Sequence, residues 1–263
     1  MGLAEKVERL ISTRGAKCAF PINICLNSQA AHYTPSEKDP LRFVRGDVVK
    51  LDVGVQADGF IADSAVTVEI STSNWTSLIR ASSEALDAAL EMSVPGIEVG
   101  AIGAAIENAI AATGFRPVRN LTGHSMEQNN LHAGITVPNI ASKDSTKLLP
   151  GMAVAIEPFA TDGKGEVGDG KNGNIYRVVR ERGFLKGSAS QFIEAVVKEF
   201  DHLPFASRWC ASIDKNYKSL LRKNWMHRNV HGYPILSEVT SGMISQAEHS
   251  VLILDNEVIV YTR

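Results

Sequence analysis

Cysteine is scarce in this chain, and its placement excludes one class of metal site. The three cysteines, Cys18, Cys25 and Cys210, form no CxxC pair and leave an odd thiol. This usage suits the reducing cytosol, and it excludes a thiolate-rich structural zinc site.

Long apolar runs are missing as well. No stretch approaches the roughly 18 consecutive apolar residues that a membrane span needs. The opening MGLAEKVERLISTRGA is charged and amphipathic, which favours a helix over a signal peptide. The net charge of −2 argues against a dedicated nucleic-acid or membrane-surface protein. We therefore expect a soluble, cytoplasmic protein that binds neither DNA nor membranes.

Several common catalytic motifs are also absent. The chain has no HExxH zinc helix and no GxSxG nucleophile elbow. GEVGDGKN at 165–172 nearly matches a phosphate-binding loop, but Asn172 replaces the required Ser or Thr and no strand–helix unit surrounds it. We predict a mobile turn at this segment.

The composition that remains is typical of a globular protein with mixed helices and strands. The 263 residues are 44% hydrophobic and 21% charged, which is enough chain for one large domain or two small ones. Alternating apolar residues on both sides of Ala57-Asp58-Gly59 predict a β-hairpin. Further strands are expected at 16–27 (interrupted at Pro21), 151–159, 174–180 and 250–262.

Helical periodicity predicts helices over 3–13, 74–92 and 99–113, and again within 184–223. Asn74 is the candidate cap of the second helix, and Gly114 is a plausible stop for the third. The small residues of GAIGAAIENAIAA at 100–112 indicate a helix that packs closely against its neighbours.

A weak internal similarity in sequence relates the two halves of the chain. His32 is followed by RGDVVKLDVG, a turn and an apolar strand that carries Asp52. His132 is followed by PGMAVAIEPF, a similar turn and strand that carries Glu157. A duplication with pseudo-twofold symmetry would bring both acids to one central cleft.

Acidic residues interrupt otherwise apolar strands at four places. An unpaired carboxylate in such a strand is costly, so each one needs a partner or access to solvent. Any one of them alone is better explained as a solvent-facing strand end. Together with a histidine they form a hard, oxygen-rich set with too many anions for one cation, which predicts a pair of divalent metal ions. The set is Asp52, Asp63, Glu157, Glu248 and His124.

Two histidines share the irregular segment GHSMEQNNLHAG. His124 and His132 each stand beside a glycine in a run that favours neither helix nor strand. They are either polar residues of a surface loop or two side chains directed into one site.

Seven segments together resemble the type 2 methionine aminopeptidases, in the right order and over essentially the whole chain. They are AAHYTP (30–35), KLDVG (50–54), ADSAVTV (62–68), LTGHSM (121–126), LHAGITVP (131–138), AIEPFAT (155–161) and QAEHSVLIL (246–254). The resemblance implies the pita-bread fold: a single α/β domain over 1–263, with a pseudo-twofold curved antiparallel sheet flanked by helices. It also implies that 181–235 is the helical insertion of type 2 enzymes.

The resemblance further implies the role of each residue in the metal site. Asp52 would bind one ion, Asp63 and Glu248 would bridge both ions, and His124 with Glu157 would complete the second site. The two ions would be Co, Mn, Fe(II) or Zn.

The reaction implied is removal of the N-terminal methionine from nascent polypeptides whose second residue is small. A hydroxide bridging the two metals would attack the first peptide bond, with Glu157 as the proton shuttle. His32 and His132 would contact the substrate. Phe20, Ile175 and Tyr233 match positions that line or edge the methionine pocket.

The charge of the expected insertion is opposite to that of the rest of the chain. Residues 180–231 hold ten Lys/Arg against five Asp/Glu. A solvated helical face explains this better than a transient ribosome contact does, and we expect a monomer. The family's domain normally begins earlier, so a truncated or mis-assigned start is an open alternative.

Two other functions are alternatives to the aminopeptidase. A proline-specific aminopeptidase or dipeptidase shares the fold and a similar metal set but generally carries an extra N-terminal domain. A non-catalytic binding relative would have lost metal ligands, whereas this chain keeps all five.

Overall fold

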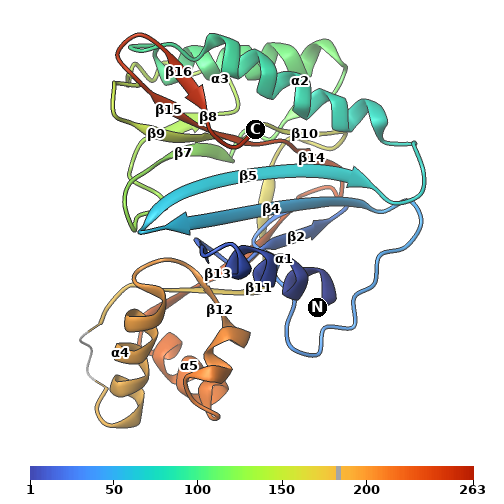
Figure 1. Cartoon of the computed structure of the whole chain (residues 1–263). Helices are drawn as coiled ribbons and strands as arrows, with labels where there is room; N and C mark the ends of the chain where they lie inside the picture. The colour runs from blue at the N-terminus through green and yellow to red at the C-terminus, as the bar shows by residue number, and fades with distance from the viewer. Residues whose placement is uncertain (182–184) are drawn as a thin grey trace.

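Helices cover the outside of a set of antiparallel sheets (Figure 1). The computed structural model describes residues 1–181 and 185–263. Within these ranges no helix is long and apolar enough to cross a membrane. The helices are α1 (Gly2–Thr13), α2 (Thr76–Met92), α3 (Val99–Ala112), α4 (Ser188–Phe200), η1 (Ser207–Ser212, a 3₁₀ helix) and α5 (Tyr217–Met226).

The strands pair only in antiparallel fashion, and their hydrogen bonds group them into four sheets within the described part of the chain. An isolated bridge between Ala65 and Glu248 joins two neighbouring sheets. The strands are β1 (Lys17–Cys18), β2 (Asn23–Leu26), β3 (Gln29–Ala31), β4 (Val48–Ala57), β5 (Phe60–Glu69), β6 (Arg116–Pro117), β7 (Thr122–Met126), β8 (Thr136–Pro138), β9 (Ala153–Ile156), β10 (Phe159–Thr161), β11 (Val167–Val178), β12 (Phe205–Ala206), β13 (Val230–Glu238), β14 (Ile244–Gln246), β15 (His249–Ile253) and β16 (Val258–Val260).

The predicted hairpin is confirmed. Strands β4 and β5 pair in unbroken register, from Val48 opposite Glu69 to Ala57 opposite Phe60. The connecting residues Asp58 and Gly59 have φ of +52° and +84°, as the tightest hairpin turns require. The hairpin crosses the middle of the molecule (Figure 1).

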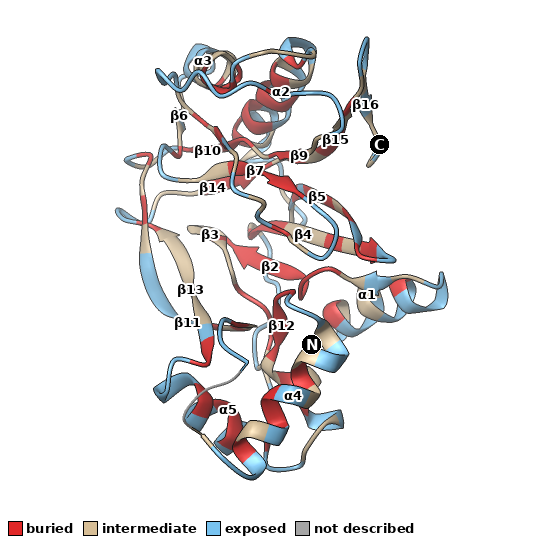
Figure 2. Cartoon of the chain, turned by 90° about the vertical axis from the view of Figure 1, so that its left-hand side faces the viewer, coloured by how far each residue is buried: buried red, intermediate tan, exposed pale blue. Residues whose placement is uncertain are grey.

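Helices α2 and α3 form a layer over the sheet that contains β7, β9 and β15 (Figure 1). In Figure 2 their buried faces point toward the strands and their exposed faces point away. A methyl group on Gly103 would lie 2.3 Å from the backbone oxygen of Ile140, and one on Gly100 would lie 2.5 Å from that of Ser142. The predicted close packing of this helix is therefore confirmed. Helix α3 ends at Ala112, Thr113 is its C-cap, and Gly114 follows with a φ of +83°, close to the expected stop.

The predicted cap of α2 is wrong. The helix begins at Thr76, and neither Asn74 nor the N-cap residue Trp75 makes a side-chain cap. Instead the carboxylate of Glu69, at the end of β5, accepts hydrogen bonds from the backbone N–H groups of Asn74 and Trp75, both 2.9 Å long. A residue from a strand thus replaces the local cap, because the turn brings the carboxylate to the free N–H groups at the helix start.

The prediction of a mobile turn at 165–172 is also wrong. Strand β11 starts at Val167 and pairs with β13, with irregularities in register around Asn172. Its glycines permit close approach of other backbone rather than mobility: a methyl group on Gly173 would lie 1.6 Å from the backbone oxygen of His32. Strand β13, which the periodicity did not indicate, supplies the pairing partner.

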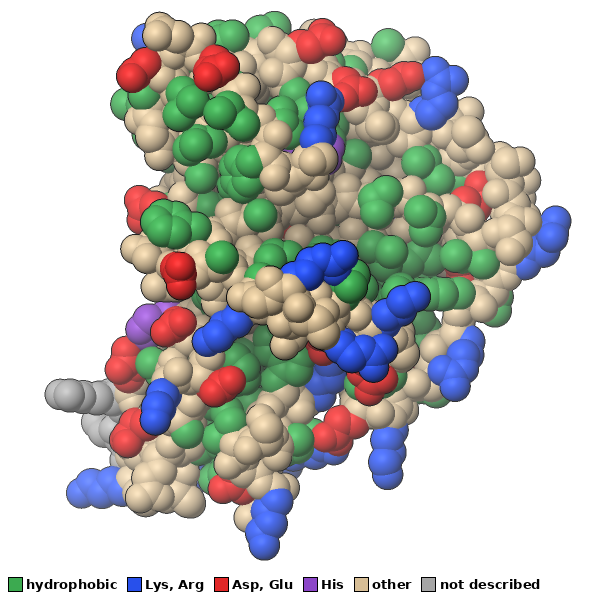
Figure 3. Space-filling model, viewed as in Figure 1, with side chains coloured by type: hydrophobic (Ala, Val, Ile, Leu, Met, Phe, Trp, Pro, Cys, Tyr) green, Lys and Arg blue, Asp and Glu red, His purple; other side chains and the backbone are tan. Residues whose placement is uncertain are grey.

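Residues 185–229 form a small helical unit between β11 and β13 (Figure 1). The helical prediction for 184–223 is confirmed in its described part, with β12 inserted, whereas residue 184 lies outside the described residues. The unit has its own hydrophobic cluster, which includes Phe192, Ile193, Val196, Phe205, Cys210, Leu221 and Val230. On the face seen in Figure 3, basic and acidic side chains are mixed over this unit, which favours a solvated surface there.

Gly103 provides a test of the packing between α3 and the segment at 138–140. Replacing a helical glycine by alanine ordinarily stabilises a helix by about 1 kcal/mol. Gly103→Ala should instead destabilise the protein by about 1–3 kcal/mol, because the methyl group meets backbone. Urea denaturation measures this difference. Gly2→Ala in α1, where the methyl group meets nothing within 4 Å, is the control, and equal stabilities for the two variants would contradict the packing argument.

Candidate metal centre

The pairing of the strands places three of the predicted acids side by side. Asp52 on β4 lies opposite Ala65 of β5, and Asp63 lies opposite Gly54, so the two carboxylates come from neighbouring positions of one hairpin. The bridge between Ala65 and Glu248 then brings the third acid beside them. Asp63 and Glu248 are buried, and Asp52 is half-buried.

The other two members of the set reach the same place from the second half of the chain. Strands β9 and β15 pair His249 with Ile156, so Glu157 and Glu248 stand next to each other just beyond that pair. His124 on β7 lies opposite Ala155. Its Nε2 atom is 3.6 Å from Asp63 Oδ2 and 3.7 Å from Glu157 Oε1. All five predicted residues therefore meet at one point.

The electrostatics of this cluster are unfavourable without a cation. Burial raises the pKa of Asp52 to about 7. Burial and the neighbouring carboxylates raise the pKa values of Asp63, Glu157 and Glu248 well above their ordinary range. Burial lowers the pKa of His124 to about 4, so its ring is neutral and offers a lone pair at neutral pH.

The donor atoms fit a divalent cation. Ligand atoms of Asp63, His124 and Glu248 all lie within 4.8 Å of one another. Among the described residues, Asp52 Oδ1, Asp63 Oδ1 and His124 Nδ1 are buried without a hydrogen-bond partner. Buried carboxylates that lack partners are paired with cations in most proteins, and carboxylate oxygens with one imidazole suit Mn, Fe(II), Co or Zn.

Both remaining histidines stand beside the cluster. The ring centroids of His124 and His132 are 4.4 Å apart, and His132 is the more exposed of the two. His32 has a left-handed backbone with φ of +68°. Its N–H donates to Asn23 Oδ1 over 2.6 Å, and its ring Nδ1 lies 3.2 Å from the Pro234 carbonyl oxygen.

A cavity of about 240 Å³, lined by both polar and apolar residues, opens onto the carboxylates. All ten residues that were predicted for the site line it, including Phe20, Ile175 and Tyr233. The ring of Tyr233 packs edge-on to His32, with centroids 5.1 Å apart. Sequence reasoning missed further apolar lining residues, namely Leu131, Phe159, Pro204 and Leu236.

Residues behind the acids hold them in place, and sequence reasoning missed them too. Ser250 Oγ accepts from the Asp63 N–H (2.9 Å) and donates to the Asp63 carbonyl (2.7 Å). Gln246 Nε2 donates to Glu248 Oε2 over 3.3 Å, and Thr67 Oγ1 both donates to and accepts from the Gln246 backbone. Polar residues buried at alternate strand positions were the only signal that could have identified them.

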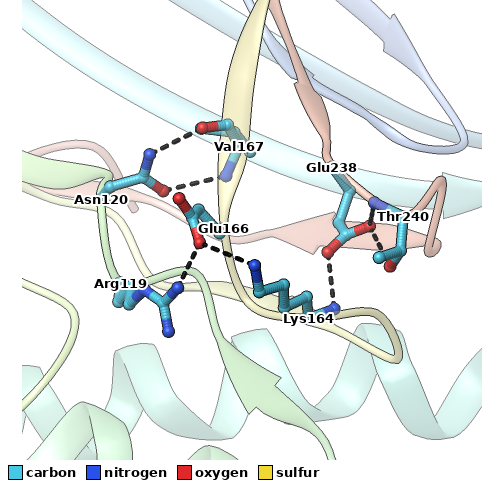
Figure 4. Close-up of polar contacts among 7 residues, drawn as sticks. All are labelled: Arg119, Asn120, Lys164, Glu166, Val167, Glu238 and Thr240. Atoms are coloured by element: carbon cyan, nitrogen blue, oxygen red, sulfur yellow. Dashed lines mark hydrogen bonds and ion pairs between the residues drawn. The ribbon is translucent and has the colours of Figure 1, made fainter.

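One wall of the cavity is held by side chains that imitate strand pairing (Figure 4). Asn120, which lines the cavity, donates to the Val167 carbonyl over 2.7 Å and accepts from the Val167 N–H over 2.9 Å. Nearby, the Glu238 carboxylate accepts hydrogen bonds from the backbone N–H of Lys164 and from the N–H and hydroxyl of Thr240. These contacts tie the cavity wall to the end of the β11–β13 ribbon at which Val167 pairs with Glu238.

Comparison with known proteins agrees with this geometry. The sequence model of metallopeptidase family M24 matches residues 2–197. A curated methionine aminopeptidase of Methanocaldococcus jannaschii is 42% identical over 263 residues, which cover 99% of this chain and 88% of the relative.

Solved structures agree on the fold alone. A thermophilic Arx1 aligns with a TM-score of 0.86 at 15% identity and covers 98% of this chain and 81% of its own. A methionine aminopeptidase of Rickettsia prowazekii aligns with a TM-score of 0.68 at 18% identity and covers 100% of this chain and 85% of its own.

The fold and the cluster of acids define a metal-dependent peptidase. The chain belongs to metallopeptidase family M24. The pita-bread architecture expected from the sequence is confirmed.

The raised carboxyl pKa values predict that metal binding releases protons in a pH-dependent way. Below its raised pKa a carboxyl holds a proton that an incoming cation must displace. Mn²⁺ should therefore release more protons at pH 6 than at pH 8, and its affinity should fall between pH 8 and pH 6. His124, with a pKa of about 4, adds no proton over this range. Titration calorimetry in two buffers of different ionisation enthalpy measures the release, and equal release at both pH values would contradict the pKa directions.

Proposed function

We propose that this protein is a methionine aminopeptidase that removes the N-terminal methionine from new polypeptides whose second residue is small. One observation carries the proposal: four carboxylates and one imidazole, all groups able to bind metal, converge in a cavity that is lined by two further histidines. The 42% identity to a methionine aminopeptidase over nearly the whole chain supports it.

We assign the metal ligands as the sequence predicted. Asp52, Asp63, His124, Glu157 and Glu248 would hold two divalent ions, with Asp52 at one of them, His124 and Glu157 at the other, and Asp63 and Glu248 shared. Two divalent ions would balance the four negative charges of the carboxylates, whereas one ion would leave two of those charges in excess. Bound divalent ions lower the pKa of water to near neutrality and so supply hydroxide for attack on the first peptide bond.

The protein groups orient the substrate and move its protons. His32 Nδ1 faces a carbonyl oxygen, which can only accept, so Nδ1 carries the proton and Nε2 is left as an acceptor. Burial lowers the pKa of His32, so this neutral form persists at pH 7 and accepts from a substrate N–H. His132 donates to the carbonyl oxygen that gains negative charge. Glu157 takes the proton from the attacking water and passes it to the leaving amine.

The cavity sets the preference for methionine. Phe20, Ile175 and Tyr233 surround a space that suits an unbranched side chain, and a thioether packs favourably against aromatic rings. A proline-specific peptidase of the same fold is the second candidate, because it would use the same acids. The space beside the aromatic rings of Phe20 and Tyr233, which suits a long thioether side chain, favours methionine.

The proposed enzyme is a single catalytic domain that carries one helical insertion. The helical insertion expected at 181–235 lies within one catalytic domain that spans 1–263, and its last residues, from Val230 on, belong to strand β13. The enzyme acts in the cytoplasm as a monomer on nascent chain ends. The mixed charge on the visible face of the insertion (Figure 3) makes a broad ribosome-binding surface the weaker interpretation of its basic residues.

Substrate choice distinguishes the two candidate functions. The metal-reconstituted enzyme should hydrolyse Met-Ala-Ser at least roughly 100-fold faster, in kcat/KM, than Ala-Pro or Leu-Lys peptides, because pocket contacts differ by a few kcal/mol between such side chains. Liquid chromatography of the released amino acid measures the rates. Faster turnover of the Ala-Pro peptide would favour the proline-specific enzyme.

Alanine variants of the paired histidines separate their roles. His124→Ala should lower the bound metal below two ions per chain together with the activity, because a ligand is lost. His132→Ala should keep both ions and lower kcat by about 10²–10³, because one transition-state donor is lost. Metal analysis and kcat, after circular dichroism confirms folding, provide the measurements. Loss of metal from His132→Ala alone would reverse the assignment.

A further inference from the structure

A second, larger hollow adjoins the cavity of the metal centre. It measures about 900 Å³ and shares His132 and Tyr233 with the first cavity. Its remaining lining, which we call the basic groove, consists of Arg177, Val179, Trp225, Met226, Arg228, Val230 and His231. A chain that leaves the first cavity past these shared residues enters the basic groove directly.

The β11–β13 ribbon orders the side chains of both hollows. Ile175 pairs with Tyr233 and Arg177 pairs with His231, and positions two apart on a strand share a face. The first pair lines the metal cavity and the second lines the basic groove. The step between the pairs is about 7 Å, which is also about the length of two residues of extended peptide.

The basic groove has a positive charge that no acidic residue of its lining offsets. Neither Arg177 nor Arg228 forms an ion pair with any residue in the described ranges. Arg177 lines the basic groove together with His132, and His132 also lines the catalytic cavity. The positive field therefore extends to the mouth of the catalytic cavity.

Two large apolar side chains of the basic groove are exposed to solvent. Trp225 is 53% exposed and Met226 is 63% exposed, both at the end of α5. Exposed apolar residues that are rimmed by charge are typical of interaction sites. Their position on the route out of the first cavity favours an extended peptide as the occupant.

We propose that the basic groove binds the substrate polypeptide beyond the cleaved bond and favours acidic side chains there. The inference rests on the proposed function, because the occupant is the rest of the same substrate. Arg177 and His231 would meet the side chains about two residues past the bond, and Arg228 would meet those further on. Trp225 and Met226 would cover the apolar edge of the bound chain.

The test compares Met-Ala-Glu-Glu-Ser, Met-Ala-Gln-Gln-Ser and Met-Ala-Lys-Lys-Ser, which vary the second and third residues past the bond, as substrates of the metal-reconstituted full chain. At low salt the Glu peptide should exceed the Gln peptide by about 3–10-fold in kcat/KM, mostly through KM, and the Lys peptide should fall below both. High salt should reduce these ratios. Because each ratio is taken within one preparation, it does not depend on the fraction of folded enzyme.

Variants then locate the preference. Arg177→Gln combined with Arg228→Gln should bring the Glu-to-Gln ratio close to 1, and Arg177→Glu should shift the preference toward the Lys peptide. Arg222→Gln is the matched control, because this exposed arginine also lies on α5 but lines a different hollow. It should keep the ratio of the unmodified enzyme.

Three results would overturn the inference, and they differ from one another. No cleavage of Met-Ala-Ser by the unmodified enzyme would overturn the proposed function and the groove together. Cleavage of all three longer peptides at equal rates would overturn the groove alone. Loss of binding to a single-stranded RNA oligonucleotide in the double variant, with its peptide ratios unchanged, would assign the groove to nucleic acid instead.

Discussion

Mutual repulsion among four closely spaced carboxylates, two buried and two half-buried, is the constraint on which the rest of this structure depends. Asp52, Asp63, Glu157 and Glu248 meet where two sheets adjoin, and their raised pKa values show the free-energy cost of ionising them together. At neutral pH such a cluster must be neutralised by protons or by bound cations, and cations allow the four carboxylates to stay ionised together. The fold must therefore hold the acids in place before any cation arrives, because flexible side chains would move apart.

Long-range contacts provide that rigidity. Lys50, two residues before Asp52 on β4, is completely buried and donates to the carbonyl oxygens of Asn27 and Ile244 over 2.6 and 3.0 Å. These bonds connect β4 to β14, the strand that leads into Glu248. Burial lowers the pKa of Lys50 to about 7, a cost that the two backbone acceptors offset in part. The left-handed backbone of His32 is held in a similar way by Asn23 and by the close approach of Gly173.

The order of the elements along the chain separates the strands that carry the metal-site acids from the helical unit beside them. The acids and His124 come from the strands of the two related halves, whose antiparallel register fixes them to within a fraction of a side-chain length. The helical unit at 185–229 is inserted between the paired strands β11 and β13 and has its own hydrophobic cluster. Such an insertion adds a surface beside the site, including Trp225 and Met226, without disturbing the strands that carry the chemistry.

Local sequence determined much of this protein, because some patterns depend only on near neighbours. The hairpin at Asp58-Gly59, the close-packed helix α3 and the anomalous acids in apolar strands could all be predicted in this way, and the family resemblance then named His32 and His132. Tertiary structure alone decided the features that join distant segments. Glu69 replaced Asn74 as the cap of α2, and residues 167–172 became part of a strand because β13 was there to pair with them. Hydrogen-bond donors and acceptors are satisfied by whatever lies close in space, and that proximity is created only when the whole chain packs.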